Sequence, residues 1–269
     1  MQTSITGGGT RRLVLAAGAV ALCAAAAPAA AWDWPARQLG GKGNGNGSVH
    51  QQARSVGHFD GVALSVPADV ELRLGASESV SVETDDNLQA LVETTVENGT
   101  LKIRVARHGV NLAPSVLRIV VQAPQVERVS LAGSGTLYAA ELRAPQLRFE
   151  VGGSGSIKVK QVRSEAVSVS IGGSGNFTAG GSTGQLTVAI GGSGSVQTGQ
   201  LNARAVQASI GGSGKAVVWP RQSLAASIGG SGGIDYYGDP QVSRSVHGSG
   251  DVRRLGAAPS QGDAAQGRR

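Results

Sequence analysis

The sequence predicts an all-β protein built around a single-stranded parallel β-helix. This β-solenoid has about seven coils of 18–20 residues, and further short strands precede it. One observation behind the prediction is an internal repeat near 20 residues, and another is that apolar residues keep the same phase in every repeat. The third is composition, because the 269 residues include 42 glycines while aromatic residues make up only 3%. Such a chain suits stacked layers of small residues better than a bulky core.

The N-terminal segment resembles an export signal. Arg11 and Arg12 precede an apolar run over residues 13–31, which ends in three alanines. A basic start, an apolar stretch and a small-residue end predict a signal peptide at residues 1–31. The arginine pair also matches a twin-arginine signal, and the choice between that route and general secretion stays open. We therefore expect an exported protein that is periplasmic, on the cell surface or secreted, with no transmembrane segment in its mature chain.

The single cysteine, Cys23, lies inside the predicted signal peptide. A lipid anchor there is the less favoured alternative, because Leu22 precedes it where a small residue is expected. Cleavage after residue 31 leaves no cysteine, which excludes disulfides and cysteine-metal clusters from the mature chain. Of 24 basic residues, Arg11 and Arg12 lie in the signal, so 22 remain against 18 acidic ones. These charges are scattered among few aromatics, so no nucleic-acid partner is predicted.

Composition divides the rest of the chain into three parts. Residues 32–54 are predicted to be a flexible linker, because the stretch GGKGNGNGS at residues 40–48 contains no apolar residue. Residues 256–269 are predicted to be a disordered tail. Residues 55–255 remain as one solenoid domain.

Short strands are predicted between residues 55 and 125. Runs such as 62–66, 70–74 and 101–105 alternate apolar and polar residues, which is the period of a half-buried strand. Asn98-Gly99 precedes the last of these runs, and both residues tolerate positive φ, which predicts a tight hairpin. Asp85-Asp86 is interpreted as a solvated turn, with weak cation binding as the alternative.

The repeat itself is a Gly-Ser-Gly motif. It begins at Gly133, Gly153, Gly173, Gly192, Gly212, Gly230 and Gly248. Two residues earlier an apolar side chain always stands: Leu131, Val151, Ile171, Ile190, Ile210, Ile228 and Val246. Stacked coils would share a continuous core. Burial of each Val, Leu or Ile side chain in it would stabilise the fold by roughly 2 kcal/mol. Glu127 and Arg244 interrupt neighbouring apolar rows, and we expect them in the first and last coils, which cap the stack.

The motif is interpreted as a structural corner. Glycine supplies positive φ there, and serine can bond a nearby backbone group. The predicted corner residues are Gly133, Ser134, Gly135, Gly153, Ser154, Gly155, Gly173, Ser174, Gly175, Gly192, Ser193, Gly194, Gly212, Ser213 and Gly214. A strip of stacked serines that engages a polymer is the alternative interpretation.

Calcium-binding nonapeptide repeats are similar to this pattern but require an aspartate. Apolar residues such as Ile157 and Phe177 occupy that position here, and calcium requires oxygen ligands. No metal site and no cofactor are predicted.

Several motifs together resemble the head GIN domain family of auto-transporter adhesins. They are the Gly-Gly-Ser-Gly corners that begin at Gly152, Gly172, Gly191, Gly211 and Gly229, the entry His58-Phe59-Asp60-Gly61-Val62, the segment 98–103 and the exit Ile234-Asp235-Tyr236-Tyr237-Gly238-Asp239-Pro240. The resemblance implies a right-handed parallel β-helix of pectin-lyase-like shape, without that fold's catalytic residues, and a role in adhesion. It offers no site residues to carry over.

The predicted function is that of an exported, non-catalytic, adhesin-like module. Its expected partner is an envelope or surface polysaccharide or protein, and the sequence does not indicate an oligomeric state. The alternative is a β-helix lyase or hydrolase that acts on polysaccharide. Carbohydrate cleavage generally needs two carboxylates close together, whereas Glu150, Glu165 and Asp235 are isolated in sequence, so no catalytic residue is predicted.

The candidate ligand surface is the aromatic group Trp219, Tyr236 and Tyr237. Exposed aromatic rings can stack on sugars, and these are the aromatic clusters of the repeats. Packing of the rings on a neighbouring coil is the alternative.

Overall fold

The computed structural model describes residues 42–107 and 110–258. The predicted signal peptide with Cys23, residues 32–41 and the tail from residue 259 lie outside this range. Within it, no helix is both long and apolar enough to cross a membrane.

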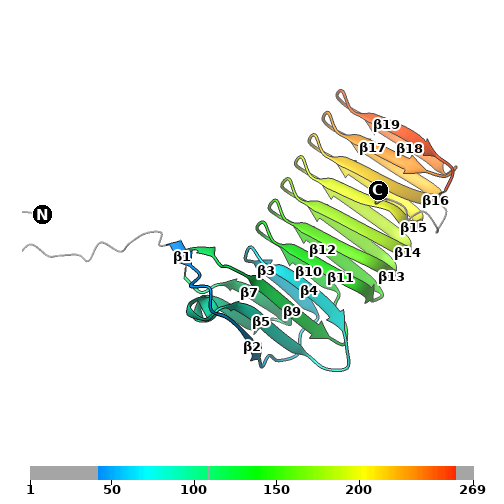
Figure 1. The fold of residues 1–269 in the computed structure, drawn as a ribbon. Coiled ribbons are helices and arrows are strands. Elements are labelled where there is room, and N and C mark those ends of the chain that lie inside the picture. Colours follow the sequence, from blue (N-terminus) through cyan, green and yellow to red (C-terminus); the bar gives the residue numbers. More distant parts are fainter. Residues whose placement is uncertain (1–41, 108–109, 259–269) are drawn as a thin grey trace, which may run out of the picture. The chain divides into compact units, whose positions relative to one another are not determined.

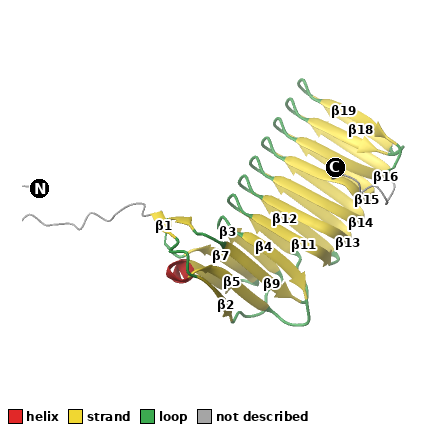
Figure 2. Cartoon of the chain, in the orientation of Figure 1, coloured by secondary structure: helices red, strands yellow, loops and turns green. Residues whose placement is uncertain are grey.

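Most of the described chain is strand, and the described residues include one short 3-10 helix, η1 (Asp86–Leu91) (Figure 2). The strands are β1 (Lys42–Asn44), β2 (Val49–Arg54), β3 (Gly61–Ser65), β4 (Asp69–Leu74), β5 (Ser79–Asp85), β6 (Val92–Glu97), β7 (Thr100–Val105), β8 (Asn111–Ala113), β9 (Leu117–Ala123), β10 (Arg128–Leu131), β11 (Thr136–Arg143), β12 (Gln146–Val151), β13 (Ser156–Ile171), β14 (Asn176–Ile190), β15 (Ser195–Ile210), β16 (Lys215–Ile228), β17 (Gly233–Tyr237), β18 (Gln241–Val246) and β19 (Asp251–Gly256).

From β10 onward the strands form a β-solenoid, which confirms the predicted fold class. Each coil runs along one sheet, bends, runs along a facing sheet and turns at a glycine corner. The strands that lead into the corners pair in parallel as β10, β12, the later halves of β13 to β16, and β18; we call this the first sheet. The strands that follow the corners form the second sheet, from β11 to β19. Figure 1 shows the coils side by side, with their corners along one edge.

The apolar rows align as the repeat predicts. Ile171 pairs with Ile190, and Ile190 pairs with Ile210, so equivalent residues lie above one another in successive coils. All three side chains are buried in the core between the sheets. Phe149 and Phe177 add the largest side chains, and their ring centroids lie 4.8 Å apart. The core is therefore built from layers of equivalent positions, each of which covers the one before.

The Gly-Ser-Gly motifs lie between the first and second sheets, and the physical reason for glycine there differs from the one expected. Among the motif's first glycines, positive φ occurs only in the first and last copies of the motif, at Gly133 and Gly248. In the coils between, the corner backbones touch. A Cβ atom on Gly173 would lie 2.5 Å from the carbonyl oxygen of Gly153, and one on Gly192 would lie 2.2 Å from that of Gly173. Glycine is thus required by the close approach of stacked coils.

Hydrogen bonds between corners use the same carbonyl groups. The Ser174 amide donates to the Gly153 carbonyl at 3.1 Å, and the Ser193 amide donates to the Gly173 carbonyl at 3.1 Å. His247 replaces a glycine at the last corner, and its amide donates to the Ile228 carbonyl at 2.7 Å. The corner serines thus contribute amides to the stack, while their side chains are exposed.

Variation in the repeat length is absorbed on the second sheet and at the bend. Thr198 and Asn202 pair with the consecutive residues Val218 and Trp219, so β16 lacks three residues that β15 has. One residue is regained directly afterwards, where Arg221 and Gln222 lie opposite Arg204 alone. The corner after β16 consequently comes 18 residues after the previous one, while the core rows stay in phase.

The N-terminal strands add a coil that lacks the glycine motif. β3 pairs in parallel with β10 and β4 with β11, and the corner between β3 and β4 contains Pro67 and Ala68. Beyond this coil, β7 and β9 continue the two sheets. Antiparallel pairs then follow: β6 pairs with β7, and β5 pairs with both β2 and β9. The β6–β7 hairpin turns at Asn98 and Gly99, with φ of 51° and 72°, as predicted.

Two expectations about the N-terminal half need correction. Residues 42–54 of the predicted linker are not a flexible coil, because β1 pairs with β8 and β2 pairs along its whole length with β5. Likewise Glu127 does not mark a capping coil, since β10 directly after it is covered by β3. Arg244 does lie at an end, on β18, where all six residues are exposed.

Asp85 is neither a solvated turn residue nor an open cation ligand. Its side chain is fully buried, and its two carboxylate oxygens accept hydrogen bonds from the amides of Gly47 and Ser115, both at 2.7 Å. Burial acts to raise the pKa of Asp85, but the hydrogen bonds from Ser115 and Gly47 outweigh it and hold the pKa below its ordinary value. Asp85 thus fastens the first strands onto the fold.

Candidate functional site

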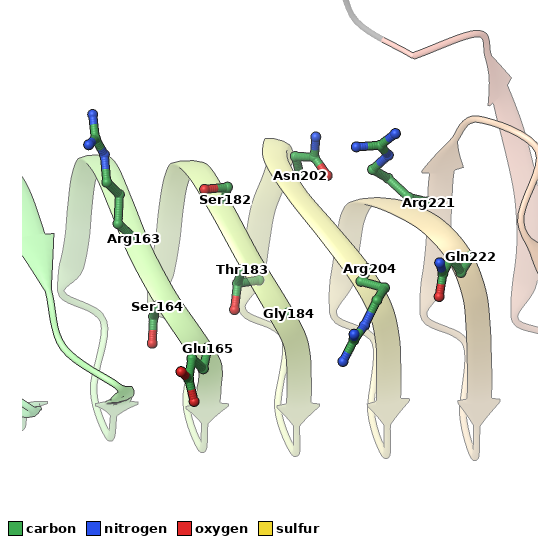
Figure 3. Close-up of a pocket in the computed structure, with 10 residues that line it drawn as sticks. All are labelled: Arg163, Ser164, Glu165, Ser182, Thr183, Gly184, Asn202, Arg204, Arg221 and Gln222. Atoms are coloured by element: carbon green, nitrogen blue, oxygen red, sulfur yellow. The ribbon is translucent and has the colours of Figure 1, made fainter.

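A polar hollow of about 860 Å³ crosses four successive coils at the bends of β13, β14, β15 and β16. We call it the bend groove. It is lined by Arg163, Ser164, Glu165, Ser182, Thr183, Gly184, Asn202, Arg204, Arg221 and Gln222 (Figure 3). Because the same bend recurs in each coil, the groove runs along the direction in which the coils stack.

Two hydroxyl groups at the bend donate hydrogen bonds to backbone carbonyl groups and so shape the bend. The Ser164 hydroxyl donates to the Ala166 carbonyl at 2.8 Å, and the Thr183 hydroxyl donates to the Gln185 carbonyl at 3.1 Å. Ser164 and Thr183 pair in register, so adjacent coils bend by the same local bond. These two groups serve the fold. The longer side chains around them remain for a ligand.

Gly184 keeps the middle of the groove hollow. It lies in register between Glu165 of the previous coil and Arg204 of the next. A Cβ atom at this position would stand 2.7 Å from the Glu165 carbonyl oxygen, so the chain approaches too closely for a side chain. The result is a gap between the acidic side chain and the basic one.

The irregularity in β16 brings further side chains to the same place. Because Arg221 and Gln222 lie opposite Arg204 alone, two side chains of one coil face one of its neighbour. Such a bulge re-aims side chains and occurs often beside functional sites. Figure 3 shows Arg163 and Arg221 extending to one side of the bends, with Glu165 and Arg204 on the other.

The groove is electropositive, since three arginines and one glutamate line it. Arg163 shares a carboxylate with Arg143: the two Nε atoms lie 3.5 Å and 2.7 Å from Glu141 Oε1. The pKa of Glu141 is lowered, chiefly by the Arg143 hydrogen bond and, against the effect of burial, by the charges of Arg143 and Arg163. Two positive charges thus share one negative charge at this end, which leaves it net positive. Within residues 42–107 and 110–258, Arg204 and Arg221 form no ion pair.

The predicted aromatic surface lies near the groove, toward the C-terminal coils. Trp219, Tyr236 and Tyr237 are all half-buried. Tyr236 packs against the core, and the Tyr237 ring lies over Gly199, where a Cβ atom would stand 3.0 Å from it. Trp219 pairs in register with the groove residue Asn202. The rings thus contact neighbouring coils, and their role as a ligand surface stays a prediction.

The carboxylates considered for catalysis lie apart. Asp235 is buried between cations, 3.2 Å from Lys215 Nζ and 3.1 Å from an Arg253 guanidinium nitrogen. Glu165 lines the groove, whereas Glu150 is exposed on the first sheet. Asp235 is thereby a link between the last three coils.

The comparisons with known proteins agree with this architecture. The chain matches, over residues 58–240, the family described as "Putative auto-transporter adhesin, head GIN domain". No curated protein matches it. A solved structure described as a putative adhesin from Bacteroides fragilis is similar, with 21% identity, a TM-score of 0.75, and coverage of 79% of this chain and 99% of that one. A structure described as a putative lipid binding protein from Parabacteroides distasonis has 26% identity, a TM-score of 0.67, and coverage of 80% and 100%.

The fold and its repeated corners define a β-solenoid protein. The family match covers more than half of the sequence, so this chain belongs to the head GIN domain family.

Proposed function

We propose that the protein is an exported, non-catalytic module that binds a polymer of the cell envelope or of a surface along its solenoid. The observation that carries this proposal is the bend groove, which is polar and continues across four coils. A hollow that runs along a stack of coils extends over strands spaced about 4.8 Å apart, which suits an extended chain more than a compact small molecule. Adhesin-like binding at a surface, as the family description suggests, accords with such a site.

Export is supported by the sequence of the N-terminal segment. The Arg11-Arg12 pair, the apolar run and the closing alanines have the order of a signal peptide. Fractionation of the native cell, with detection of the mature chain, tests this part. The chain is expected in the periplasm, on the surface or in the medium; a full-length chain in the cytoplasm would contradict export.

Absence of catalysis is supported by the groove's side chains. Hydrolysis of glycosidic bonds generally uses two carboxylates close together, whereas Glu165 is the one carboxylate among the ten lining residues.

A binding array of glycans, peptidoglycan and host-surface polymers tests the function as a whole. We expect saturable binding to at least one polymer, with no change in that polymer's chain length during incubation. A loss of chain length would assign the site to an enzyme instead. Failure to bind any polymer or surface would refute the proposed function.

A further inference from the structure

The composition of the bend groove indicates the chemistry of its ligand. A planar guanidinium group donates paired hydrogen bonds that match the geometry of carboxylate and sulfate groups. Arg204 and Arg221 are exposed, and within the described parts of the chain no carboxylate neutralises them. These two side chains therefore favour a negatively charged ligand over a neutral one.

The spacing of the arginines favours an extended ligand. Arg163 lies on β13 and Arg221 on β16, three coils apart, which at the usual distance between strands separates their backbones by about 14 Å. Arg204 lies between them, on β15. Figure 3 shows Arg204 extending to the side of the bends opposite Arg163 and Arg221, so a ligand that contacts all three must be extended, as a chain with a charge on successive units is.

The remaining side chains favour a polysaccharide over a lipid surface. Asn202 and Gln222 offer amide donors and acceptors for sugar hydroxyls, and Ser182 adds an exposed hydroxyl. Anchoring on a bilayer requires apolar side chains that enter the acyl region, and the ten lining residues include no large apolar side chain.

We propose that the bend groove binds a short segment of an acidic polysaccharide laid along the stack of coils. Arg163, Arg204 and Arg221 bind its carboxylate or sulfate groups. Asn202 and Gln222 bind its hydroxyls. This inference rests on the proposed function and adds to it the charge of the ligand and the residues that hold it.

The test is a binding titration with the mature chain at low ionic strength. The probes are polygalacturonate for carboxylates, heparin for sulfates, dextran as a neutral polymer, and phosphatidylglycerol vesicles as an anionic lipid surface. The variants are Arg163→Gln, Arg204→Gln and Arg221→Gln. The matched control is Arg118→Gln, an equal change of charge on β9, where Arg118 is exposed and lies 3.4 Å from Glu83. All four side chains are exposed, so each variant is expected to fold. Thermal melting verifies this.

The inference predicts binding to polygalacturonate or heparin that added salt weakens. Each groove substitution should weaken this binding roughly tenfold, as expected for loss of one charge-assisted hydrogen bond, while Arg118→Gln should leave it unchanged. Equal weakening by all four variants would show a response to net charge alone and would overturn the inference. So would binding of dextran or vesicles in place of the acidic polymers. If the array finds a neutral polymer that binds and the groove variants bind it normally, this inference fails while the proposed function stands.

Discussion

The carbonyl oxygen of Gly153 lies 2.5 Å from the point at which a Cβ atom on Gly173 would stand, and it also accepts the amide hydrogen bond of Ser174. One carbonyl group therefore both joins two coils and excludes a side chain from the second. A Cβ atom on the preceding glycine, Gly172, would meet no other atom within 4 Å. Of the two adjacent glycines in this Gly-Gly-Ser-Gly corner, the second thus excludes a side chain and the first does not.

Replacement of each glycine by alanine tests this difference. Gly173→Ala forces the coils apart at the corner, and we expect it to lower the free energy of unfolding by about 1–3 kcal/mol. Gly172→Ala meets no atom and needs no positive φ, so it should be neutral or slightly stabilising. Urea unfolding of both variants measures the difference. Equal effects of the two substitutions would contradict the close-approach explanation.

Truncation of a stacked isoleucine tests the shared core. Ile190 lies between Ile171 and Ile210 and is buried, so Ile190→Ala should cost about 2–5 kcal/mol of unfolding free energy. The adjacent residue Ala189 faces outward, and Ala189→Ser should change stability by less than about 0.5 kcal/mol. Denaturant unfolding measures both. A loss below about 1 kcal/mol for Ile190→Ala would show that the rows are not packed as described.

Acid sensitivity is predicted from Asp85. Its folded pKa lies below its ordinary value, so the stability that its ionised form contributes is complete above the ordinary pKa and is lost as the pH falls through the folded pKa. Asp85→Asn replaces one accepting oxygen by a donor, which opposes the amide of Gly47 or Ser115. The variant should melt at a lower temperature near neutral pH, and the difference from the wild type should shrink in acid.

The neighbouring Asp86 provides the control for this measurement. It is exposed, and Asp86→Asn should change stability by less than about 0.5 kcal/mol. Melting temperatures recorded across the acidic range compare the two variants. A constant difference between Asp85→Asn and the wild type at every pH would contradict the role of the charge.

Binding in the bend groove should be visible at Trp219. This residue pairs in register with Asn202 and stands two positions before Arg221. An acidic oligosaccharide at these residues alters the indole's surroundings, so tryptophan emission should change with the same saturation curve as binding. Trp219→Phe should abolish the change while binding persists. Emission that does not respond in the wild type would place the ligand elsewhere.

The sequence predicted those features that repeat in each coil. Ile171 and Ile190 keep their phase to the corner glycines, and stacking requires that phase, so the core could be predicted residue by residue. The role of Gly173 could not, because the close approach of two backbones depends on the coil before it. The coil of β3 and β4 was missed as part of the solenoid, since its corner contains Pro67 and lacks the glycine motif.

The candidate site was missed for a related reason. Arg163, Arg204 and Arg221 occupy no common position in the repeat, and their separations in sequence are unequal. Arg221 comes to the groove beside Arg204 only because β16 lacks three residues before Trp219 and has one extra residue opposite Arg204. A single sequence carries no signal for such shifts in register. The buried position of Asp85 could not be predicted either, because its hydrogen-bond donors, Gly47 and Ser115, come from distant segments of the chain.

The most direct measurement of the central claim is a crystal structure of the mature chain grown with a short oligogalacturonide. We predict that the sugar chain lies along the bends of β13 to β16, with carboxylates within hydrogen-bonding distance of Arg204 and Arg221. An oligosaccharide bound to the outer face of either sheet, or at the corner serines, with the bend groove left empty would contradict the account.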